Sequence, residues 1–157
     1  MTLLGEYRNA RRAEDGARLR RAIALRAMVA TGMSQQQIGD ALGISQPAVS
    51  QQLRYAPDLE AVRPEELLEA AAPVLKALAS ERGYRGLAVF GSVARGEAGL
   101  DSDLDLIVDA PKGTSSFEFL RFKQLIEHVL GREIDLISYG GLKPGMDDDI
   151  RRDAVLL

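Results

Sequence analysis

Residues 91–105 of the chain read GSVARGEAGLDSDLD, and this stretch decides the fold of the region around it. An apolar run, Leu87–Phe90, leads into the Gly-Ser pair, and a second apolar run, 106–108, follows the last aspartate. Short apolar runs bounded by turn residues predict two strands that this stretch connects. Because a strand shows alternate side chains on one face, Asp103 and Asp105 are expected to project together.

Each half of the stretch carries chemistry of its own. Two carboxylates side by side repel each other unless a cation lies between them. A Gly-Ser turn lets backbone N–H groups approach a phosphate closely. Together the two halves predict metal-assisted phosphoryl or nucleotidyl chemistry. The alternative is an anion-free turn followed by a surface-charged strand, which does not require the two halves at this spacing.

The pattern resembles the signature of the nucleotidyltransferase superfamily that includes DNA polymerase beta: a Gly-Ser pair, ten residues, then Asp-x-Asp. Its longer form, G-S-x-A-R-G-E…S-D-x-D-L, is similar to the small bacterial branch, the minimal nucleotidyltransferases. The resemblance implies a third metal carboxylate on a strand beside the Asp-x-Asp strand, where Asp135 lies between apolar neighbours. We expect Asp135 to be buried among Ile134, Leu136 and Ile137, which is costly for a carboxylate unless it shares a cation. The alternative is an ordinary capped acid at a strand end.

The same resemblance implies the roles of these acids. Asp103, Asp105 and Asp135 are expected to be the catalytic and metal-binding residues, holding two Mg²⁺ ions. One ion orients the triphosphate of the donor, ATP. The other activates the attacking hydroxyl, whose proton Asp135 helps to remove.

The nucleotide-binding residues are expected in the Gly-Ser turn and just after it. Gly91 and Ser92 are expected to hold the phosphates through backbone N–H groups and the serine hydroxyl. Arg95 is a candidate for neutralising phosphate charge. Its alternative role is a structural ion pair with Glu97 or Asp101.

Composition excludes several classes of protein. With 46% apolar and 27% charged residues, the chain suits a folded protein of one ordinary domain or two small ones. No run approaches the roughly 20 apolar residues of a membrane span, and the N-terminus lacks the pattern of a secretion signal. The chain has no cysteine, which fits a reducing cytoplasm, and a single histidine, His128, which argues against a zinc site. We therefore expect a cytoplasmic protein without a membrane partner.

Charge divides the chain into two parts. Residues 1–57 hold eight arginines and no lysine against four acids, whereas residues 58–157 hold twelve basic residues against nineteen acids. This asymmetry predicts two modules with different partners. The first favours a polyanion such as DNA, and the second favours a divalent cation.

Helical spacing of apolar residues predicts three helices in the basic part, at 18–31, at 35–42 and directly after Ser45, with residues 1–17 as an arm or a helical extension. Ser34 and Ser45 are expected to cap the last two helices, and Gly43 to make the turn between them. Ile38 and Leu42 are expected to point inward. Residues 34–53 resemble a repressor-type helix-turn-helix.

The resemblance implies DNA binding by the third helix as a homodimer on an inverted repeat. Glutamine can read adenine, and arginine can read guanine or bind phosphate. The candidate DNA-binding residues are Ser45, Gln46, Ala48, Ser50, Gln51 and Arg54. The alternative is a helical adaptor that never touches DNA.

Residues 57–63, bracketed by prolines, are predicted to link a helix-turn-helix domain at 1–56 to a nucleotidyltransferase domain at 64–157. The second domain is expected to contain helices at 64–82, kinked or divided at Pro73, and at 116–130, and a third strand at 133–138. The expected fold class is an all-α helix-turn-helix domain followed by an α/β (α+β) nucleotidyltransferase domain, with a small mixed sheet flanked by helices.

From the small size of residues 64–157 we expect no appended substrate domain, so the resemblance implies a macromolecular acceptor. In minimal nucleotidyltransferases the acceptor is typically a HEPN-domain ribonuclease toxin, which the enzyme, as antitoxin, modifies with AMP on a tyrosine hydroxyl. A DNA-binding module fits an antitoxin that represses its own operon. The alternatives are a non-catalytic regulator that only binds nucleotide or toxin, and a transferase toxin or tRNA-modifying enzyme. The acidic second module argues against an RNA substrate.

Overall fold

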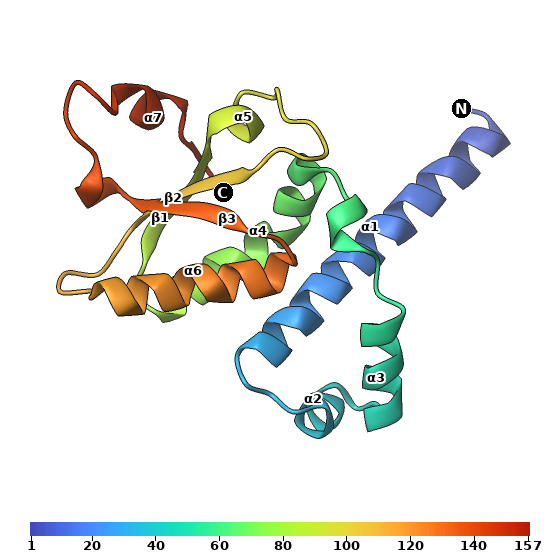
Figure 1. Ribbon diagram of the computed structural model, residues 1–157. Coiled ribbons are helices and arrows are strands. Elements are labelled where there is room, and N and C mark those ends of the chain that lie inside the picture. Colours follow the sequence, from blue (N-terminus) through green and yellow to red (C-terminus); the bar gives the residue numbers. More distant parts are fainter. The chain divides into compact units, whose positions relative to one another are not determined.

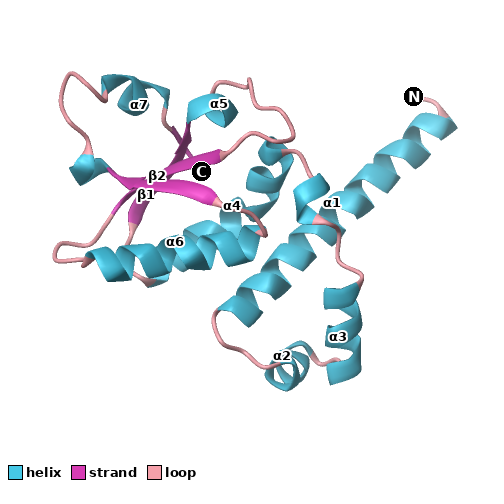
Figure 2. Ribbon diagram, in the orientation of Figure 1, coloured by secondary structure: helices cyan, strands magenta, loops and turns pink.

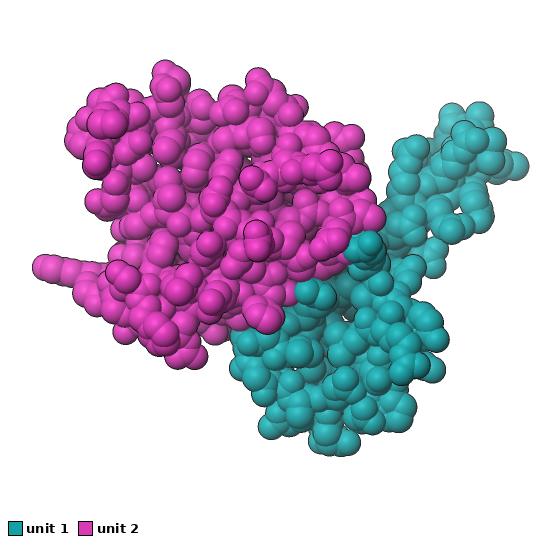
Figure 3. All heavy atoms as spheres, viewed as in Figure 1, with its two compact units in different colours: residues 1–58 teal, residues 59–157 magenta.

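The computed structural model describes residues 1–157, which divide into two compact units, 1–58 and 59–157 (Figure 3). The division falls within the stretch 57–63 that proline spacing marks as a linker. None of the helices combines the length and the apolar character that crossing a membrane requires.

The first unit contains three helices, α1 (Leu3–Ala30), α2 (Gln35–Leu42) and α3 (Gln46–Arg54). Residues before Arg18 continue α1 as a helical extension, and its N-terminal half reaches beyond α2 and α3 (Figure 1). Leu25, Ile38 and Val49, one from each helix, form the buried core. Four partly buried residues pack against it: Met28, Met33, Ile44 and Leu53.

Local hydrogen bonds explain why α2 and α3 begin, and why α2 ends, where the sequence predicts. Ser34 accepts a hydrogen bond from the Gln37 N–H, while the Gln37 side chain accepts one from the Ser34 N–H. Ser45 caps α3 through a single hydrogen bond, which its side chain accepts from the Ala48 N–H. Gly43 takes the left-handed conformation that ends α2, with φ of 72°.

Gly39 brings α2 against the turn before α3. A Cβ atom at this position would lie 2.7 Å from the backbone oxygen of Ile44. The absence of a side chain at Gly39 therefore allows α2 to pack closely against this turn.

Leu42 corrects the sequence prediction. It was expected to point inward with Ile38, but its side chain is 49% exposed whereas Ile38 is fully buried. Although the two positions share a helix face, α2 has only eight residues and ends at Leu42. The chain turns away at Gly43, so α1 and α3 cover Ile38 but not the last turn of α2.

The second unit contains a four-stranded mixed sheet, whose strands are magenta in Figure 2. The strand order is β3-β2-β1-β4. β1 pairs antiparallel with β2 and with β4, and β2 pairs parallel with β3. The strands are β1 (Arg85–Phe90), β2 (Leu104–Asp109), β3 (Ile134–Ser138) and β4 (Val155–Leu156). The α-helices are α4 (Pro64–Glu81), α5 (Gly91–Ala94), α6 (Ser116–Leu130) and α7 (Asp148–Asp153), with 3₁₀ turns at Leu59–Ala61 and Tyr139–Gly141. The expected mixed sheet flanked by helices is confirmed.

Within this unit, α4 and α6 lie on one face of the sheet, and α5 and α7 lie on the other (Figure 1). In β2 the even-numbered residues Leu104, Leu106 and Val108 are fully buried. Phe122 of α6 stacks on Tyr84, with ring centroids 4.1 Å apart. The alternation of side chains leaves the odd-numbered positions of β2 for the face that carries α5.

Pro73 does not divide α4, which runs without a break from Pro64 to Glu81. A proline inside a helix costs about 3 kcal/mol. Five apolar side chains along α4 are buried and offset this cost: Leu67, Leu68, Ala71, Leu75 and Leu78.

Part of the predicted linker is built into the second unit. Leu59 is buried, and the Arg132 guanidinium donates hydrogen bonds to the carbonyl oxygens of Leu59 and Val62, at 2.7 and 3.0 Å. The chain therefore becomes fixed to the second unit several residues before α4 begins.

Candidate functional site

The two aspartates of the Asp-x-Asp pair lie at the beginning of β2. Asp103 lies in the turn just before the strand and is exposed, and Asp105 is the second residue of the strand and is half-buried. Leu104 between them is fully buried. Because side chains alternate along a strand, Asp105 belongs to the face opposite the α6 layer, whereas Asp103 precedes the strand and lies beside residues of α6.

The third predicted acid, Asp135, lies next to Asp105 on the neighbouring strand. β2 and β3 pair in parallel, and the register places Asp135 opposite Asp105. Asp135 is exposed, so the expectation that it is buried was wrong. Ile134 and Leu136 are buried and face the helices, and the same alternation turns Asp135 to the open face.

Gly91 permits the close approach of the Gly-Ser turn to Asp105. It adopts φ of 73°, in the left-handed region that favours glycine. A Cβ atom on Gly91 would lie 2.2 Å from Oδ2 of Asp105, which is far inside van der Waals contact. Only glycine therefore fits at position 91, where the Gly-Ser turn packs directly against the carboxyl group of Asp105. Ser92 follows it in the short helix α5.

Asp105 has the most perturbed carboxyl group of the site. Partial burial, hydrogen bonding to Asp135, and repulsion by Asp135 and Asp103 raise its pKa from the ordinary 3.8 to about 6. Arg95 acts in the opposite direction. The carboxylates of Asp103, Asp105 and Asp135 thus repel one another, and a bound cation or proton would reduce this repulsion.

Arg95 forms ion pairs within its own unit. Its guanidinium donates a hydrogen bond to Glu97 at 3.1 Å and lies 3.5 Å from Asp153 of α7. The hydrogen bond that Arg95 donates to Glu97 raises the pKa of Arg95 above its ordinary value. Of the two ion-pair partners considered from sequence, Glu97 is present and Asp101 is not. Asp153, 58 positions away, is a partner that sequence reasoning missed.

A cavity of about 330 Å³, called here the Asp135 pocket, opens beside Asp103 and Asp135. α6 contributes Leu120, Lys123 and Gln124 to its lining. Lys123 is the one basic residue among the lining acids, and sequence reasoning missed it. The position of Lys123 on α6 could not be related to the site from sequence, because helical spacing does not show which end of which strand a helix packs beside.

The structure contains no group of three His, Cys, Asp or Glu side chains arranged to hold a metal ion. It brings Asp105 and Asp135 together but does not assemble Asp103, Asp105 and Asp135 into a closed three-ligand cluster. The donor chemistry still fits a divalent cation, because all three groups are oxygen ligands and the repulsion at Asp105 favours a positive charge.

In the first unit, the candidate DNA-binding residues lie on α3 and at its N-cap. Gln51 and Arg54 are exposed, Ala48 and Ser50 are half-exposed, and Ser45 caps the helix. Gln46 donates a hydrogen bond from Nε2 to Oε1 of Gln35 at 2.6 Å, so α2 holds its side chain in place.

Comparison with known proteins gives a family match that falls within the second unit. The family described as the nucleotidyltransferase domain matches residues 73–157. The protein adenylyltransferase MntA of Thermococcus cleftensis is 38% identical over 80 residues, which cover 51% of this chain and 81% of the relative. A Methanocaldococcus jannaschii protein, described as a candidate protein adenylyltransferase, is 36% identical over 75 residues, covering 48% of this chain and 81% of that protein.

One similar solved structure is described as that of a candidate minimal nucleotidyltransferase. It has a TM-score of 0.54 and 39% sequence identity, and the match covers 59% of this chain and 95% of that chain. The stretch that contains Gly91, Asp105 and Asp135 lies inside the family match.

Proposed function

The chain belongs to the nucleotidyltransferase domain family, and from that membership we propose that its second unit is a metal-dependent enzyme that transfers AMP from ATP to a hydroxyl group of a protein. The relatives named as protein adenylyltransferases support this choice of donor and acceptor. The observation that carries the proposal is the packing of the Gly91 turn against Asp105, with Asp135 paired beside it.

The site residues have different roles in this proposal. Asp103, Asp105 and Asp135 would hold Mg²⁺, up to two ions, which when bound supplies positive charge to the phosphates of ATP. The backbone N–H groups at Gly91 and Ser92, together with the serine hydroxyl, bind the terminal phosphates, because the first N–H groups of a helix have no partner within it. Arg95 contributes positive charge nearby only to the extent that Glu97 and Asp153 release it.

The transfer itself is a substitution at phosphorus. The acceptor oxygen bonds to the α-phosphorus of ATP, the bond to the bridging oxygen breaks, and pyrophosphate leaves. The proton of the acceptor hydroxyl passes to the carboxylate of Asp135, which is exposed and therefore accessible to an incoming protein. The Asp135 pocket, next to this carboxylate, is the entrance for the acceptor side chain.

The test uses the whole chain, α-³²P-ATP, Mg²⁺ and the purified product of the neighbouring gene. We expect label on that product, and loss of the label with Asp103→Ala plus Asp105→Ala. Asp109→Ala, which removes an exposed acid from the other end of the same strand, is the matched control and should keep transfer. Transfer that survives the double substitution would contradict the proposed site.

We further propose that the first unit is a helix-turn-helix domain that binds operator DNA as a homodimer, and that the chain is an antitoxin. Its partner would be a toxin, such as a HEPN-domain ribonuclease, and the chain would repress its own operon in the cytoplasm. The outward position of Gln51 and Arg54 on α3 supports the DNA-binding part.

A gel-shift experiment with the DNA upstream of the gene tests DNA binding. We expect a shifted complex that Gln46→Ala, Gln51→Ala and Arg54→Ala together abolish. Unchanged binding by the triple variant would show that α3 does not read the DNA. If ATP alters DNA binding while no acceptor is labelled, the second unit is a nucleotide-binding regulator and not an enzyme.

A further inference from the structure

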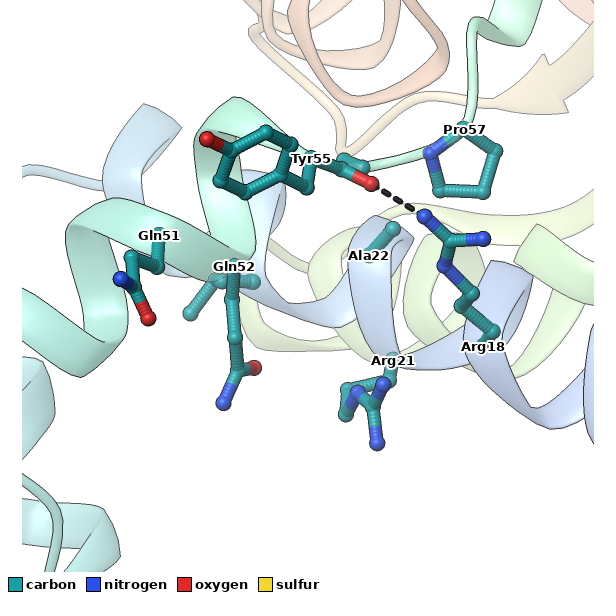
Figure 4. Close-up of a pocket in the computed structure, with 9 residues that line it drawn as sticks. Arg18, Arg21, Ala22, Gln51, Gln52, Tyr55 and Pro57 are labelled. Carbon is teal, nitrogen blue, oxygen red and sulfur yellow. Dashed lines mark hydrogen bonds between the residues drawn. The ribbon is translucent and has the colours of Figure 1, made fainter.

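A hollow of about 200 Å³ lies in the first unit, between α1 and the C-terminal end of α3 (Figure 4). We call it the arginine pocket. Its lining includes Arg18 and Arg21 from α1 and Gln51, Gln52 and Tyr55 from α3 and its C-cap, and no acidic residue lines it. Two guanidinium groups without a carboxylate give the pocket a positive potential, which favours an anion.

The two arginines have different roles. Arg18 donates a hydrogen bond to the carbonyl oxygen of Tyr55, the C-cap residue of α3, and so ties α1 to the end of that helix (Figure 4). Arg21, one turn further along α1, forms no hydrogen bond or ion pair in the structure. Its guanidinium and the Gln52 amide extend to the same side of the pocket (Figure 4). Arg21 is therefore the group available to a ligand.

The size of the pocket limits what it can hold. Sites that enclose a whole small ligand measure about 300–1,000 Å³. The arginine pocket is smaller and open, so it suits one charged group of a larger molecule. A phosphate fits the donors, because guanidinium groups bind phosphate oxygens through two parallel hydrogen bonds and a carboxamide adds one more.

We propose that Arg21 and Gln52 bind a phosphodiester group of duplex DNA, next to the groove in which α3 would lie. This inference rests on the proposed DNA binding of the first unit. Gln51 lines the pocket and is also one of the exposed candidate readers on α3, so the pocket borders the predicted reading face. The eight arginines of residues 1–58, against five acids, give the unit the positive balance that a DNA strand requires.

The experiment measures binding of the full chain to two fluorescent duplexes, the DNA upstream of its gene and a scrambled version, over a range of salt concentrations. Each phosphate contact adds about 0.9 to the slope of log affinity against log salt. Arg21→Ala should therefore lower that slope by about 0.9 and weaken both duplexes equally, by roughly 5- to 10-fold near 0.1 M salt. Arg20→Ala is the matched control, because it removes an exposed arginine from the adjacent position outside the pocket.

Each outcome separates this inference from the proposed function. If the wild-type chain binds neither duplex, the proposed DNA binding is wrong and this inference falls with it. If it binds and Arg21→Ala keeps the wild-type slope, or if Arg20→Ala has the same effect as Arg21→Ala, only the arginine pocket assignment is wrong. Displacement of the duplex by millimolar AMP from the wild type but not from Arg21→Ala would assign the pocket to a free nucleotide instead. A thermal melt of each variant checks that the fold is intact.

Discussion

The two units hold their candidate functional residues in opposite ways. In the second unit, Asp105 is held by its strand pairing with Asp135 and by the close packing of Gly91 against its carboxyl group. In the first unit, Gln51 and Arg54 extend from a helix surface into solvent. Chemistry at a fixed atom requires the first arrangement, whereas contact with a long polymer tolerates the second. A single methyl group should therefore have much larger consequences for the site in the second unit.

Gly91→Ala should give the largest effect. The added methyl group overlaps Asp105 and the residue must keep φ of 73°, so either the turn or the acid has to move. A displacement of about 1 Å at a reacting centre costs on the order of 100-fold in rate. We expect at least that loss in transfer of labelled AMP.

Gly113→Ala is the control that distinguishes backbone strain at a positive φ from the steric contact with Asp105. Gly113 also has a positive φ, 87°, but a Cβ atom there meets nothing within 4 Å. It should cost about 1–2 kcal/mol of stability and leave transfer unchanged. Equal losses of transfer in both variants would mean that the contact with Asp105 is not what makes Gly91 necessary.

Gly39→Ala applies the same methyl group to the first unit. The nearest atom is the backbone oxygen of Ile44, at 2.7 Å, and backbone cannot move aside as cheaply as a flexible side chain. We expect a loss of about 1–3 kcal/mol, measured as faster hydrogen exchange of the α2 and α3 amides, with transfer unchanged. Gly16→Ala, within α1, is the control with the opposite sign, because alanine favours a helix by up to about 1 kcal/mol. Loss of transfer in Gly39→Ala would show that the units are not independent.

The pH dependence of stability should report the repulsion at Asp105. Because its pKa is raised in the folded state to about 6, its contribution to stability is greatest below pH 4 and is lost as the pH rises through 6. Asp105→Asn removes this loss. At pH 8 the second unit of the variant should melt about 4–8 °C above that of the wild type, which corresponds to roughly 1 kcal/mol after allowing for solvent screening of a half-exposed carboxyl group.

The control for this prediction is Asp109→Asn, at the exposed end of the same strand, which should not raise the melting temperature at pH 8. The difference between Asp105→Asn and wild type should shrink when the pH is lowered to 4. A constant difference from pH 4 to pH 8 would contradict titration of Asp105 as its cause.

Much of both units could be predicted from local sequence. α2 and α6 have the predicted bounds because a serine cap precedes each helix and a glycine in the left-handed conformation ends it, at Gly43 and Gly131. The connection of Gly91 with the acid pair was predictable because both lie in one continuous stretch. These features depend on interactions between near neighbours in the chain.

The remaining features depend on which distant elements pack together. The ion pair of Arg95 with Asp153 needs α7 to return beside α5, and Lys123 enters the site only because α6 passes the beginning of β3. Asp135 was expected to be buried because its neighbours in sequence are apolar. In a strand those neighbours occupy the other face, so apolar flanks do not predict burial at the position between them.

Leu42 provides the smallest and most discriminating prediction. It was assigned to the core by the spacing that correctly placed Ile38, but α2 ends before any neighbour covers it. Leu42→Gln should therefore change the free energy of unfolding by less than about 0.5 kcal/mol, whereas Ile38→Ala should cost about 2–5 kcal/mol, both measured by urea unfolding. A loss above about 1 kcal/mol in Leu42→Gln would mean that its side chain is covered in solution. Since no residue of the first unit buries it, that cover would come from outside this unit, and a loss that diminishes as the protein is diluted would assign the cover to a second copy of the chain.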